Sequence, residues 1–250
     1  MMKVRAVLHA HSRWSYDGHW SLKALASLYG SMGVRAVMMS EHDSGFDPAA
    51  FGTYRAACAA ASTPRCQLIP GIEYSSPDND IHILTWGLES FLAEHRPVAE
   101  TLARVRDLGG VAVFAHPVRR AAWRTFDPAW VPHLAGIELW NRKSDGISWG
   151  AEAQTLLHDT GLPATVGQDF HGLRQLYPLT QLFDLNRDLE REPQALEKAL
   201  VAALAEGRTQ PQAFRRALLL KNGLPHRAVH PRLEWVRRRL RDAMRKQGRS

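Results

Sequence analysis

The feature that most limits how this chain can fold is a repeated pattern in which an apolar run ends in histidine or acidic residues. The pattern begins with His9-Ala-His11 at the end of the apolar run at 4–8, and two residues that are two apart on a strand are expected to share one face. Asp17 follows in a turn that contains glycine. It returns in five more segments, SEHD at 40–43, GIE at 71–73, AHP at 115–117, GIE at 136–138 and GQDFH at 167–171. A single such site is explained equally well by turn capping, but six sites in register with six apolar runs favour a shared function.

Apolar runs that alternate with amphipathic segments indicate an α/β fold. Strands are predicted at 3–8, 34–39, 67–74, 81–86, 111–115, 136–140, 164–166 and 179–185, and helices at 21–33, 48–61, 98–108, 151–160 and 193–206. The runs at 67–74 and 81–86 flank a polar turn and suggest a hairpin. The remaining alternation predicts a parallel sheet closed, or nearly closed, into a barrel, whose strand ends would bring the polar residues together on one face.

The composition is compatible with one barrel of ordinary size. The chain has 250 residues, of which 45% are hydrophobic, so a sizeable core is available. No apolar run reaches the roughly 18 residues of a membrane span, and no signal-peptide pattern is present, so we expect a cytoplasmic protein without membrane contact. Cys58 and Cys66 are the only cysteines, and a reduced pair is favoured over a single disulfide.

Positive charge is concentrated at the C-terminal end. The formal net charge is +7, but residues 215–250 carry 12 Lys and Arg against two acidic residues, which leaves −3 for residues 1–214. Apolar residues at helical spacing within 226–250 predict a helix with a basic face. This helix either packs on the barrel, which we favour, or binds nucleic acid or another acidic partner. We therefore divide the chain into a barrel at 1–210 and a basic helical extension at 211–250.

Four segments together resemble the motifs of the PHP family, the polymerase and histidinol phosphatase superfamily. HAHSRWSYDG at 9–18 is similar to the first motif, GVRAVMMSEHD at 33–43 to the second, FAHP at 114–117 to the third and GQDFH at 167–171 to the fourth. The resemblance covers residues 3–210 and holds in order, spacing and strand context. It implies a distorted seven-stranded, TIM-like β/α barrel, to which the tail adds a C-terminal helix. It also implies a phosphoesterase that depends on two or three metal ions.

The resemblance implies nine metal ligands in this chain. One ion would bind His9, His11, Glu73 and Asp169, a second would share Glu73 and take His82 and His116, and a third would take Asp17, His42 and His171. Neutral imidazoles and carboxylates suit Zn, Mn or Fe and do not choose among them. Glu41 stands before His42 where the family usually has Asp, and we expect this change to alter the orientation of His42.

A centre of this kind suits the hydrolysis of phosphoesters. Two metal ions about 3.5–4 Å apart lower the pKa of a bridging water toward about 7 and stabilise both the attacking and the leaving oxygen. The hydroxide that bridges two of the ions would therefore be the nucleophile. The resemblance further implies catalytic roles for Glu73 and His171.

Charged residues beside the motifs are candidates for substrate binding. Arg119 or Arg120 follows the AHP segment, and Arg142 or Lys143 follows the run at 136–140. Each of them could bind a substrate phosphate or be a solvated loop charge. His19, two residues after Asp17, could contact the substrate or simply be exposed near the start of a helix.

Three tryptophans and one glutamate near the motifs each have two possible roles. Trp14, Trp20 and Trp140 lie near the motifs, where they either form a wall that stacks on a ring or pack in the core. Glu138 ends the run at 136–140, where it either supports a metal-bound histidine or pairs with a buried arginine.

The predicted substrate is a phosphorylated small molecule or a nucleotide, and the basic tail makes an oligonucleotide an alternative. A non-catalytic, metal-stabilised PHP binding module is the alternative function, but such a module usually lacks ligands, and none of the nine is missing. Hydrolysis of a C–N bond in an amidohydrolase-like barrel is disfavoured, because no lysine that could bridge two metal ions lies between Lys23 and Lys143.

Overall fold

The computed structural model describes residues 2–185, 195–220 and 223–226, together with residues 229, 232, 235, 236 and 239. The strands are β1 (Met2–Ala10), β2 (Ala36–Met39), β3 (Glu41–His42), β4 (Gln67–Ile69), β5 (Gly71–Ser75), β6 (His82–Trp86), β7 (Val111–Phe114), β8 (Gly136–Asn141), β9 (Ala164–Phe170), β10 (Leu179–Leu185), β11 (Thr209–Ala213) and β12 (Arg216–Ala217). The helices are α1 (Leu22–Ser31), α2 (Phe51–Ala61), α3 (Val98–Asp107), α4 (Arg142–Asp145), α5 (Ala151–Thr160) and α6 (Ala195–Ala205), with 3₁₀ helices η1 (Pro48–Ala50), η2 (Arg119–Thr125) and η3 (Pro128–His133). The α/β class is therefore confirmed.

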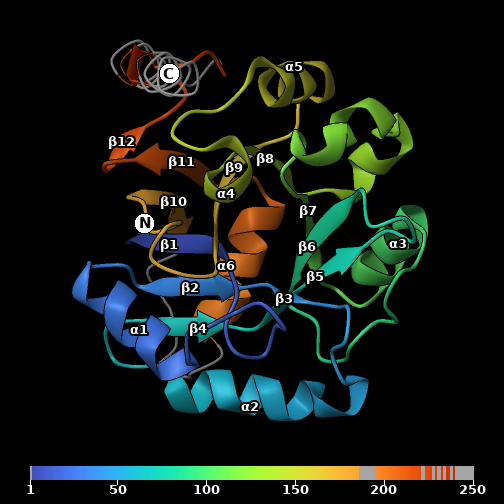
Figure 1. Cartoon of the computed structure of the whole chain (residues 1–250), viewed down its shortest axis with the longest axis vertical. Coiled ribbons are helices and arrows are strands. Elements are labelled where there is room, and N and C mark those ends of the chain that lie inside the picture. The colour runs from blue at the N-terminus through green and yellow to red at the C-terminus, as the bar shows by residue number, and fades with distance from the viewer. Residues whose placement is uncertain are drawn as a thin grey trace, which may run out of the picture.

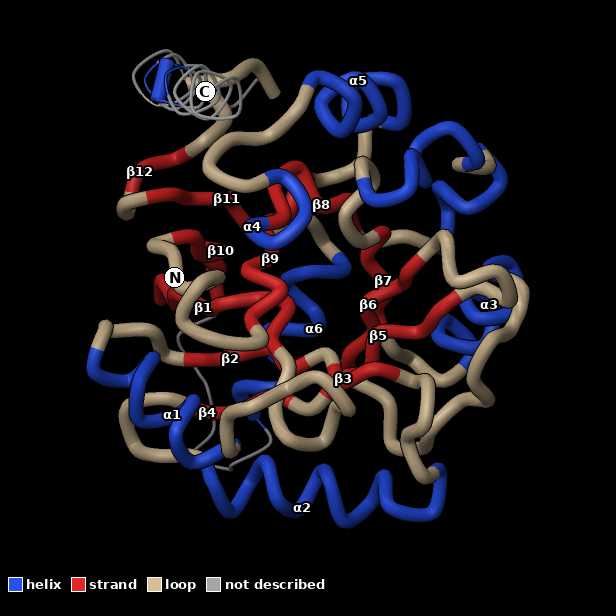
Figure 2. Tube along the Cα trace, viewed as in Figure 1, coloured by secondary structure: helices blue, strands red, loops and turns tan. Residues whose placement is uncertain are grey.

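The strands form one mixed sheet of twelve strands that curves around α6 (Figures 1 and 2). The paired order is β12-β11-β10-β1-β9-β8-β7-β6-β5-β3, and β2 joins it by pairing with β1 and β4. The predicted hairpin is confirmed, because β5 and β6 pair antiparallel. The expectation of a parallel sheet is corrected, because β6 also pairs antiparallel with β7, and β10 pairs antiparallel with β1 and β11.

The sheet has more strands than the seven that the resemblance implies, for two reasons. Single residues interrupt what would otherwise be long strands: Ser40 separates β2 from β3, and Pro70, which has no backbone N–H to donate, separates β4 from β5. In addition, β10, β11 and β12 extend the sheet beyond β1.

The boundary predicted at residue 210 falls inside β11, which pairs with β10 over residues 209–213. The sheet therefore continues past residue 210, and the division at this position stays a prediction. The predicted basic helix at 226–250 falls mostly outside the described residues. Within the described residues, no helix is both long and apolar enough to cross a membrane.

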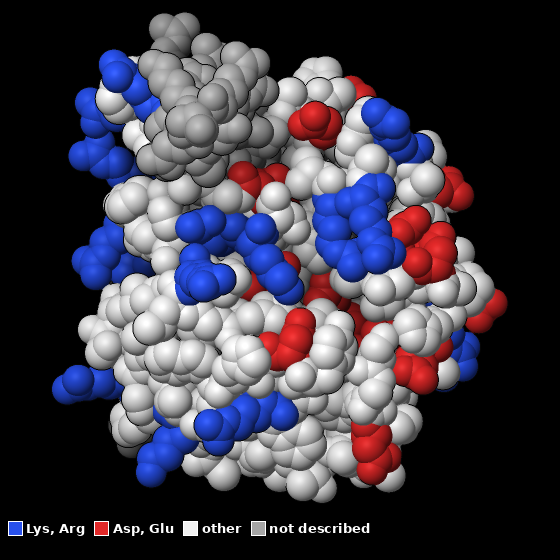
Figure 3. Space-filling model, viewed as in Figure 1, with Lys and Arg blue, Asp and Glu red and all other residues white. Residues whose placement is uncertain are grey.

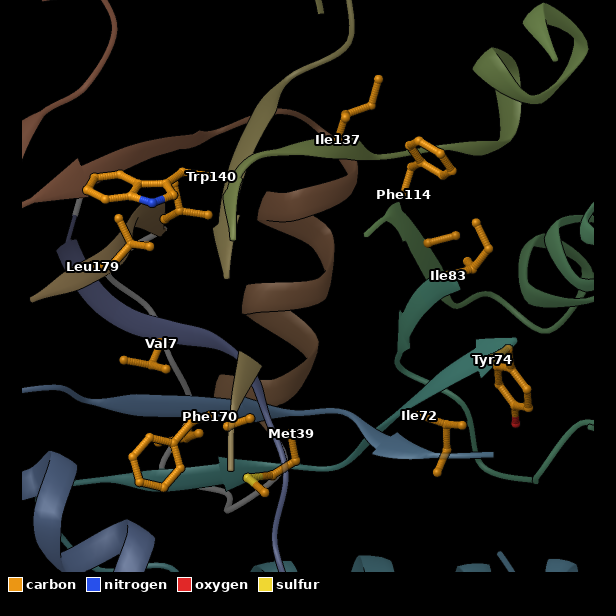
Figure 4. Packing of buried hydrophobic residues seen from close by; sticks show 14 of the residues in the cluster. Val7, Met39, Ile72, Tyr74, Ile83, Phe114, Ile137, Trp140, Phe170 and Leu179 are labelled. Atoms are coloured by element: carbon orange, nitrogen blue, oxygen red, sulfur yellow. The ribbon is translucent and has the colours of Figure 1, made fainter. Parts of the chain in front are cut away.

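Buried apolar side chains cover both faces of the sheet. Alternate residues of β1 illustrate this, because Leu8 packs in the cluster that contains α6, whereas Val7 packs in the cluster beneath the outer helices. Figure 4 shows part of the outer cluster, including Val7 and Trp140. A strand that is covered on both faces consists of a nearly continuous run of apolar residues. The sequence has such a run before each polar strand end. Cys58 and Cys66 are buried and free.

Candidate metal centre

The carboxylate of Glu73 is the centre of the site. It lies in β5 and is only 1% exposed. Five imidazoles surround it: His9 Nε2 at 3.4 Å, His11 Nε2 at 3.4 Å and His42 Nδ1 at 3.2 Å from Oε2, and His82 Nδ1 at 2.7 Å and His116 Nε2 at 2.8 Å from Oε1. His9, His11, His42 and His116 lie near the C-terminal ends of β1, β3 and β7, which converge as the sequence pattern predicts. His82 reaches the same place from the start of β6, which runs antiparallel to β5 and β7.

Two aspartates complete the cluster. Asp169 Oδ1 lies 3.7 Å from His9 Nε2, 3.5 Å from His11 Nε2 and 3.3 Å from His171 Nδ1. Asp17 lies on the other side of His171, with Oδ2 3.0 Å from His171 Nε2 and Oδ1 3.3 Å from His42 Nε2. The donor atoms fall into three groups, each within 4.8 Å: His11, Asp17, His42 and His171; His9, Glu73 and His116; and His9, His11 and Asp169.

His82 is the one predicted ligand outside these three groups. Its Nδ1 lies 2.7 Å from Glu73 Oε1, and its Nε2 lies 2.6 Å from Asn79 Oδ1. Both ring nitrogens therefore face oxygen atoms of the protein. The structure brings His82 to the carboxylate of Glu73, and its role as a ligand stays a prediction.

The donor atoms of the cluster fit metal ions. Several buried ring nitrogens make no hydrogen bond within the described part of the chain, namely His9 Nε2, His11 Nε2 and His116 Nδ1. A buried polar atom without a partner costs about 1–3 kcal/mol, and a bound cation would remove that cost. Imidazole nitrogens and carboxylate oxygens are ligands for Zn, Mn and Fe. The residues present therefore suit divalent metal ions.

The electrostatics of the cluster keep its carboxylates ionised. Burial by itself raises the pKa of Glu73, but the imidazoles around it, above all His9 and His82, hold that pKa well below its usual value. Burial lowers the pKa of His42, but hydrogen bonds to Asp17 and Glu73 outweigh it and raise the pKa to about 10. A metal ion must displace such a proton, so metal affinity rises with pH.

The backbone is strained at three of the converging residues. His9, His116 and Asp169 have φ values of 63°, 26° and 50°, in the left-handed region that costs a non-glycine residue about 1–3 kcal/mol and is frequent at functional sites. The pairing of β1 also shifts register between Leu8 and Ala10. The expectation that His9 and His11 share one face of a regular strand is therefore corrected: β1 ends at Ala10, and an irregular backbone brings the two imidazoles together.

Glu138, in β8, supports two histidines and pairs with no arginine among the described residues. Its Oε1 accepts a hydrogen bond from His9 Nδ1–H at 2.9 Å, and its Oε2 accepts from the backbone N–H of His116 at 2.8 Å. The amide of Asn141 also donates to Oε2, at 3.0 Å. The proton of a neutral His9 is thereby assigned to Nδ1, which leaves Nε2 free to bind a cation beside Glu73.

Replacing Glu138 by Gln is expected to weaken metal binding by about 10- to 100-fold. An amide offers one oxygen, so it cannot accept from both His9 and the backbone of His116. Competition with a chromogenic chelator measures the affinity, and Glu89→Gln, at an exposed position, is the matched control. An unchanged affinity in Glu138→Gln would show that this support is dispensable.

Glu41 is linked to the neighbouring histidines through Ser15, and its effect on the orientation of His42 stays a prediction. Its buried carboxylate accepts hydrogen bonds from Ser12 Oγ and Ser15 Oγ, both at 2.6 Å. Ser15 Oγ in turn accepts from the backbone N–H of His42 at 3.0 Å and lies 3.2 Å from His11 Nδ1. Glu41 therefore holds the loop after β1 and reaches His11 through Ser15, and it makes no described hydrogen bond to the imidazole of His42.

A pocket of about 210 Å³ opens onto the cluster. Its lining consists of Tyr16, Asp17, His42, Ser44, Glu73, Ser75, Asn79, His82, His116, Arg119, Lys143, Ser144 and Asp169. Figure 3 shows two groups of Lys and Arg side chains on this face, with acidic atoms in the hollow between them. The pocket thus combines an acidic floor that suits cations with a basic rim that suits an anionic substrate.

Two of the candidate cations line the pocket. Arg119 is held by the backbone carbonyl of Asn79, at 2.9 Å from its Nη1. Lys143, in α4, places its Nζ 3.1 Å from His171 Nε2 and 3.4 Å from Asp169 Oδ1. Sequence reasoning offered Lys143 as an alternative to Arg142, and the geometry favours the lysine.

The other three candidates for substrate binding are not among the lining residues. Arg120 is paired with Asp80, at 3.0 Å. Arg142 lies over the ring of Tyr177, 5.3 Å from its centroid. His19 is exposed. These three residues therefore lie outside the pocket lining that contains Arg119 and Lys143.

The aromatic residue at the pocket is one that sequence reasoning missed. Trp140 packs on Trp149 within the core, and the half-buried Trp14 and Trp20 pack against the core on Tyr54 and Phe170. Tyr16 lines the pocket instead, with its ring 5.1 Å from that of His42. Its place in the first motif, directly before Asp17, is the signal that could have identified it.

Comparison with solved structures identifies this architecture. The chain aligns with a two-domain protein from Bacteroides vulgatus that contains a predicted PHP-like metal-dependent phosphoesterase, with a TM-score of 0.64 and 16% identity, over 88% of this chain and 66% of that one. The chain has the PHP fold. The resemblance seen in the four sequence motifs is thus confirmed by the tertiary structure.

Two other solved structures are similar to this chain in fold. PsfC from Pseudomonas syringae aligns over 98% of this chain and 100% of its own length, with a TM-score of 0.61 and 15% identity. The lesion-specific endonuclease Q from Pyrococcus furiosus aligns over 87% of this chain and 58% of its own, with a TM-score of 0.57 and 16% identity. The chain thus spans under two thirds of the endonuclease and about two thirds of the Bacteroides protein. No protein-family model matches the chain, and no curated protein matches it in sequence.

Proposed function

We propose that this chain is a metal-dependent hydrolase of phosphoesters. The observation that carries the proposal is the convergence of imidazole and carboxylate donors around Glu73, with buried donor atoms that lack a hydrogen-bond partner. The PHP fold supports the same class, since solved structures with this fold include a predicted phosphoesterase and an endonuclease.

The proposed ligands are the nine residues that the sequence motifs indicate, with Glu73 shared between two metal ions. Bound divalent ions would supply Lewis-acid chemistry, namely an activated water and stabilisation of charge on the phosphate oxygens. Zn, Mn and Fe are the candidates, and two or three ions is the proposed content. We retain His82 in this set because its Nδ1 is 2.7 Å from Glu73 Oε1.

The protein's own residues would bind and orient the substrate. Lys143 acts as a point charge beside Asp169, and the planar guanidinium of Arg119 can bind two phosphate oxygens at once. His171 is also proposed to be catalytic, because its ring is held in one orientation at the pocket. Its Nδ1 lies 2.9 Å from the carbonyl oxygen of Asp169, so its Nε2 faces Asp17. Glu73 holds the surrounding imidazoles in one geometry.

We also infer a closed barrel of seven strands. If β2 with β3 and β4 with β5 each act as one strand, the pairings of β1 with β2, β2 with β4, β5 with β6, and onward through β7, β8 and β9 back to β1 form a ring. This ring supports the distorted β/α barrel that the sequence resemblance implies.

Metal analysis beside an activity screen tests the proposed function. We expect two or three metal ions per chain after supply of Mn, Zn or Fe, and turnover of a phosphomonoester or phosphodiester. The screen includes a short oligonucleotide at several salt concentrations, because a steep fall of kcat/KM with salt indicates contacts to several phosphates. Stoichiometric metal without turnover of any phosphoester would favour the binding module, and absence of metal after reconstitution would contradict the proposal.

A further inference from the structure

One side chain that lines the pocket, Tyr16, differs from the polar residues around it. Tyr16 is the only aromatic carbocycle among the lining residues, which are otherwise histidines and charged or small polar side chains. It is 77% exposed, more than any other large hydrophobic side chain of the described residues. An exposed aromatic ring at the mouth of an anion-binding pocket is a feature that the proposed metal chemistry leaves unexplained.

The ring of Tyr16 is held in place from one side. It stacks on the imidazole of His42, with the centroids 5.1 Å apart and the planes at 21°. The residues on either side of it are anchored, because Ser15 Oγ donates to Glu41 at 2.6 Å and Asp17 contacts both His42 and His171. The loop also closes tightly, since a Cβ at Gly18 would lie 1.9 Å from the carbonyl oxygen of Ser12.

Such a ring is suited to stacking on a second ring. His42 lies against one of its faces, and the exposure of the side chain leaves the other face for a ligand. A tyrosine that is already positioned loses little conformational freedom when a planar group stacks on it, and stacking is favourable for every base because every base has a π-face. Asp17 and His42, two of the proposed metal ligands, line the same pocket as Tyr16.

We propose that Tyr16 is a specificity-determining residue that stacks on a planar ring in the leaving group, so that the site prefers nucleoside phosphates to phosphoesters without a ring. This inference rests on the proposed function for the position of the phosphate. A purely structural role, in which Tyr16 only shields His42 from solvent, would affect ligands with and without a ring alike. The two roles therefore predict different ratios of the affinities for a ligand with a ring and a ligand without one.

The test compares two ligands that differ only in the base, AMP and ribose 5-phosphate. Calorimetry on the metal-loaded full chain, at a temperature at which neither ligand is hydrolysed during the titration, gives a Kd for each. The ratio of the two is the preference for the base. We expect Tyr16→Ala to lower this preference by about tenfold, and Tyr16→Phe, which retains the ring, to keep it. Leu108→Ala, at an exposed position remote from the pocket lining, is the control, and metal content and Tm verify that each variant is folded.

The possible outcomes separate this inference from the proposed function. Equal weakening of both ligands in Tyr16→Ala would overturn stacking and indicate shielding of His42. A wild-type protein that hydrolyses phosphoesters but binds the two ligands equally would also overturn stacking while leaving the proposed function intact. A base preference that disappears in Tyr16→Ala, in a protein that hydrolyses no phosphoester, would uphold stacking and contradict the proposed function. Failure of the metal-loaded chain to bind either phosphate would contradict both.

Discussion

Replacing Glu73 by Gln lowers kcat/KM for phosphoester hydrolysis by about 10³-fold, or ~4 kcal/mol of transition-state stabilisation, and reduces the metal content of the protein. The physical reason is that Glu73 is the anion shared by five imidazoles, within 2.7 to 3.4 Å of each. A glutamine carries no charge and turns an NH₂ group toward some of these nitrogens, so it cannot serve as the carboxylate between two cations.

Steady-state kinetics and elemental analysis of the same preparation measure the two effects of Glu73→Gln together. Glu100→Gln is the matched control, because Glu100 is exposed and its one described partner is Arg96 in an i,i+4 surface pair. Wild-type turnover in a folded, fully metal-loaded Glu73→Gln protein would contradict the shared-carboxylate arrangement.

Replacing Gly167 by Ala is expected to destabilise the protein and weaken its metal site at the same time. An added Cβ at this position in β9 would lie 1.8 Å from Glu138 Oε1 and 2.9 Å from His9 Cβ. Forcing extra atoms into a packed interior costs about 1–3 kcal/mol, and for a chain of this size each kcal/mol lowers Tm by about 2–4 °C. Glu138 must move to relieve the contact, and it then no longer orients His9.

Thermal unfolding with and without metal separates these two consequences of Gly167→Ala. A lower Tm in the metal-free protein reports the packing cost, and a smaller increase of Tm on adding metal reports the weakened site. Gly52→Ala in α2 is the control, because a Cβ there meets no atom within 4 Å. A Gly167→Ala protein with both wild-type values would disprove the close approach of β9 to Glu138.

Most helices and strands could be predicted, because the spacing of apolar residues along the sequence follows which side chains are buried. The helix expected at 21–33 is observed as α1, and the hairpin expected around residues 75–81 is observed as β5 and β6. The antiparallel pairing of β10 with β1 could not be predicted, because a strand buried on both faces has the same apolar run whichever way its neighbour points. The short strands at Glu41–His42 and Arg216–Ala217 carry too few residues for any period to be visible.

Candidate ligands were identifiable from the sequence, but several of their supporting contacts were not. Imidazoles and carboxylates at strand ends are a visible pattern, and the structure gathers these side chains around Glu73. The path from Glu41 through Ser15 to His11 depends on hydroxyl groups in a loop whose shape no periodicity describes. The sequence also could not show that Lys143, rather than Arg142, lines the pocket. That outcome depends on how the four-residue helix α4 is placed over β9.

The sequence by itself determined the α/β class, the positions of the polar strand ends and the chemical types of the converging donors. These features are local, since each depends on the order of apolar and polar residues within one segment. Only the tertiary structure decided which of the nearby side chains reach the pocket, that Glu138 supports His9, and that Tyr16 rather than a tryptophan faces the opening. Those features depend on contacts between separate segments, such as His9 and Glu138, or on strained backbone at His9, His116 and Asp169. Neither leaves a periodic signal in the sequence.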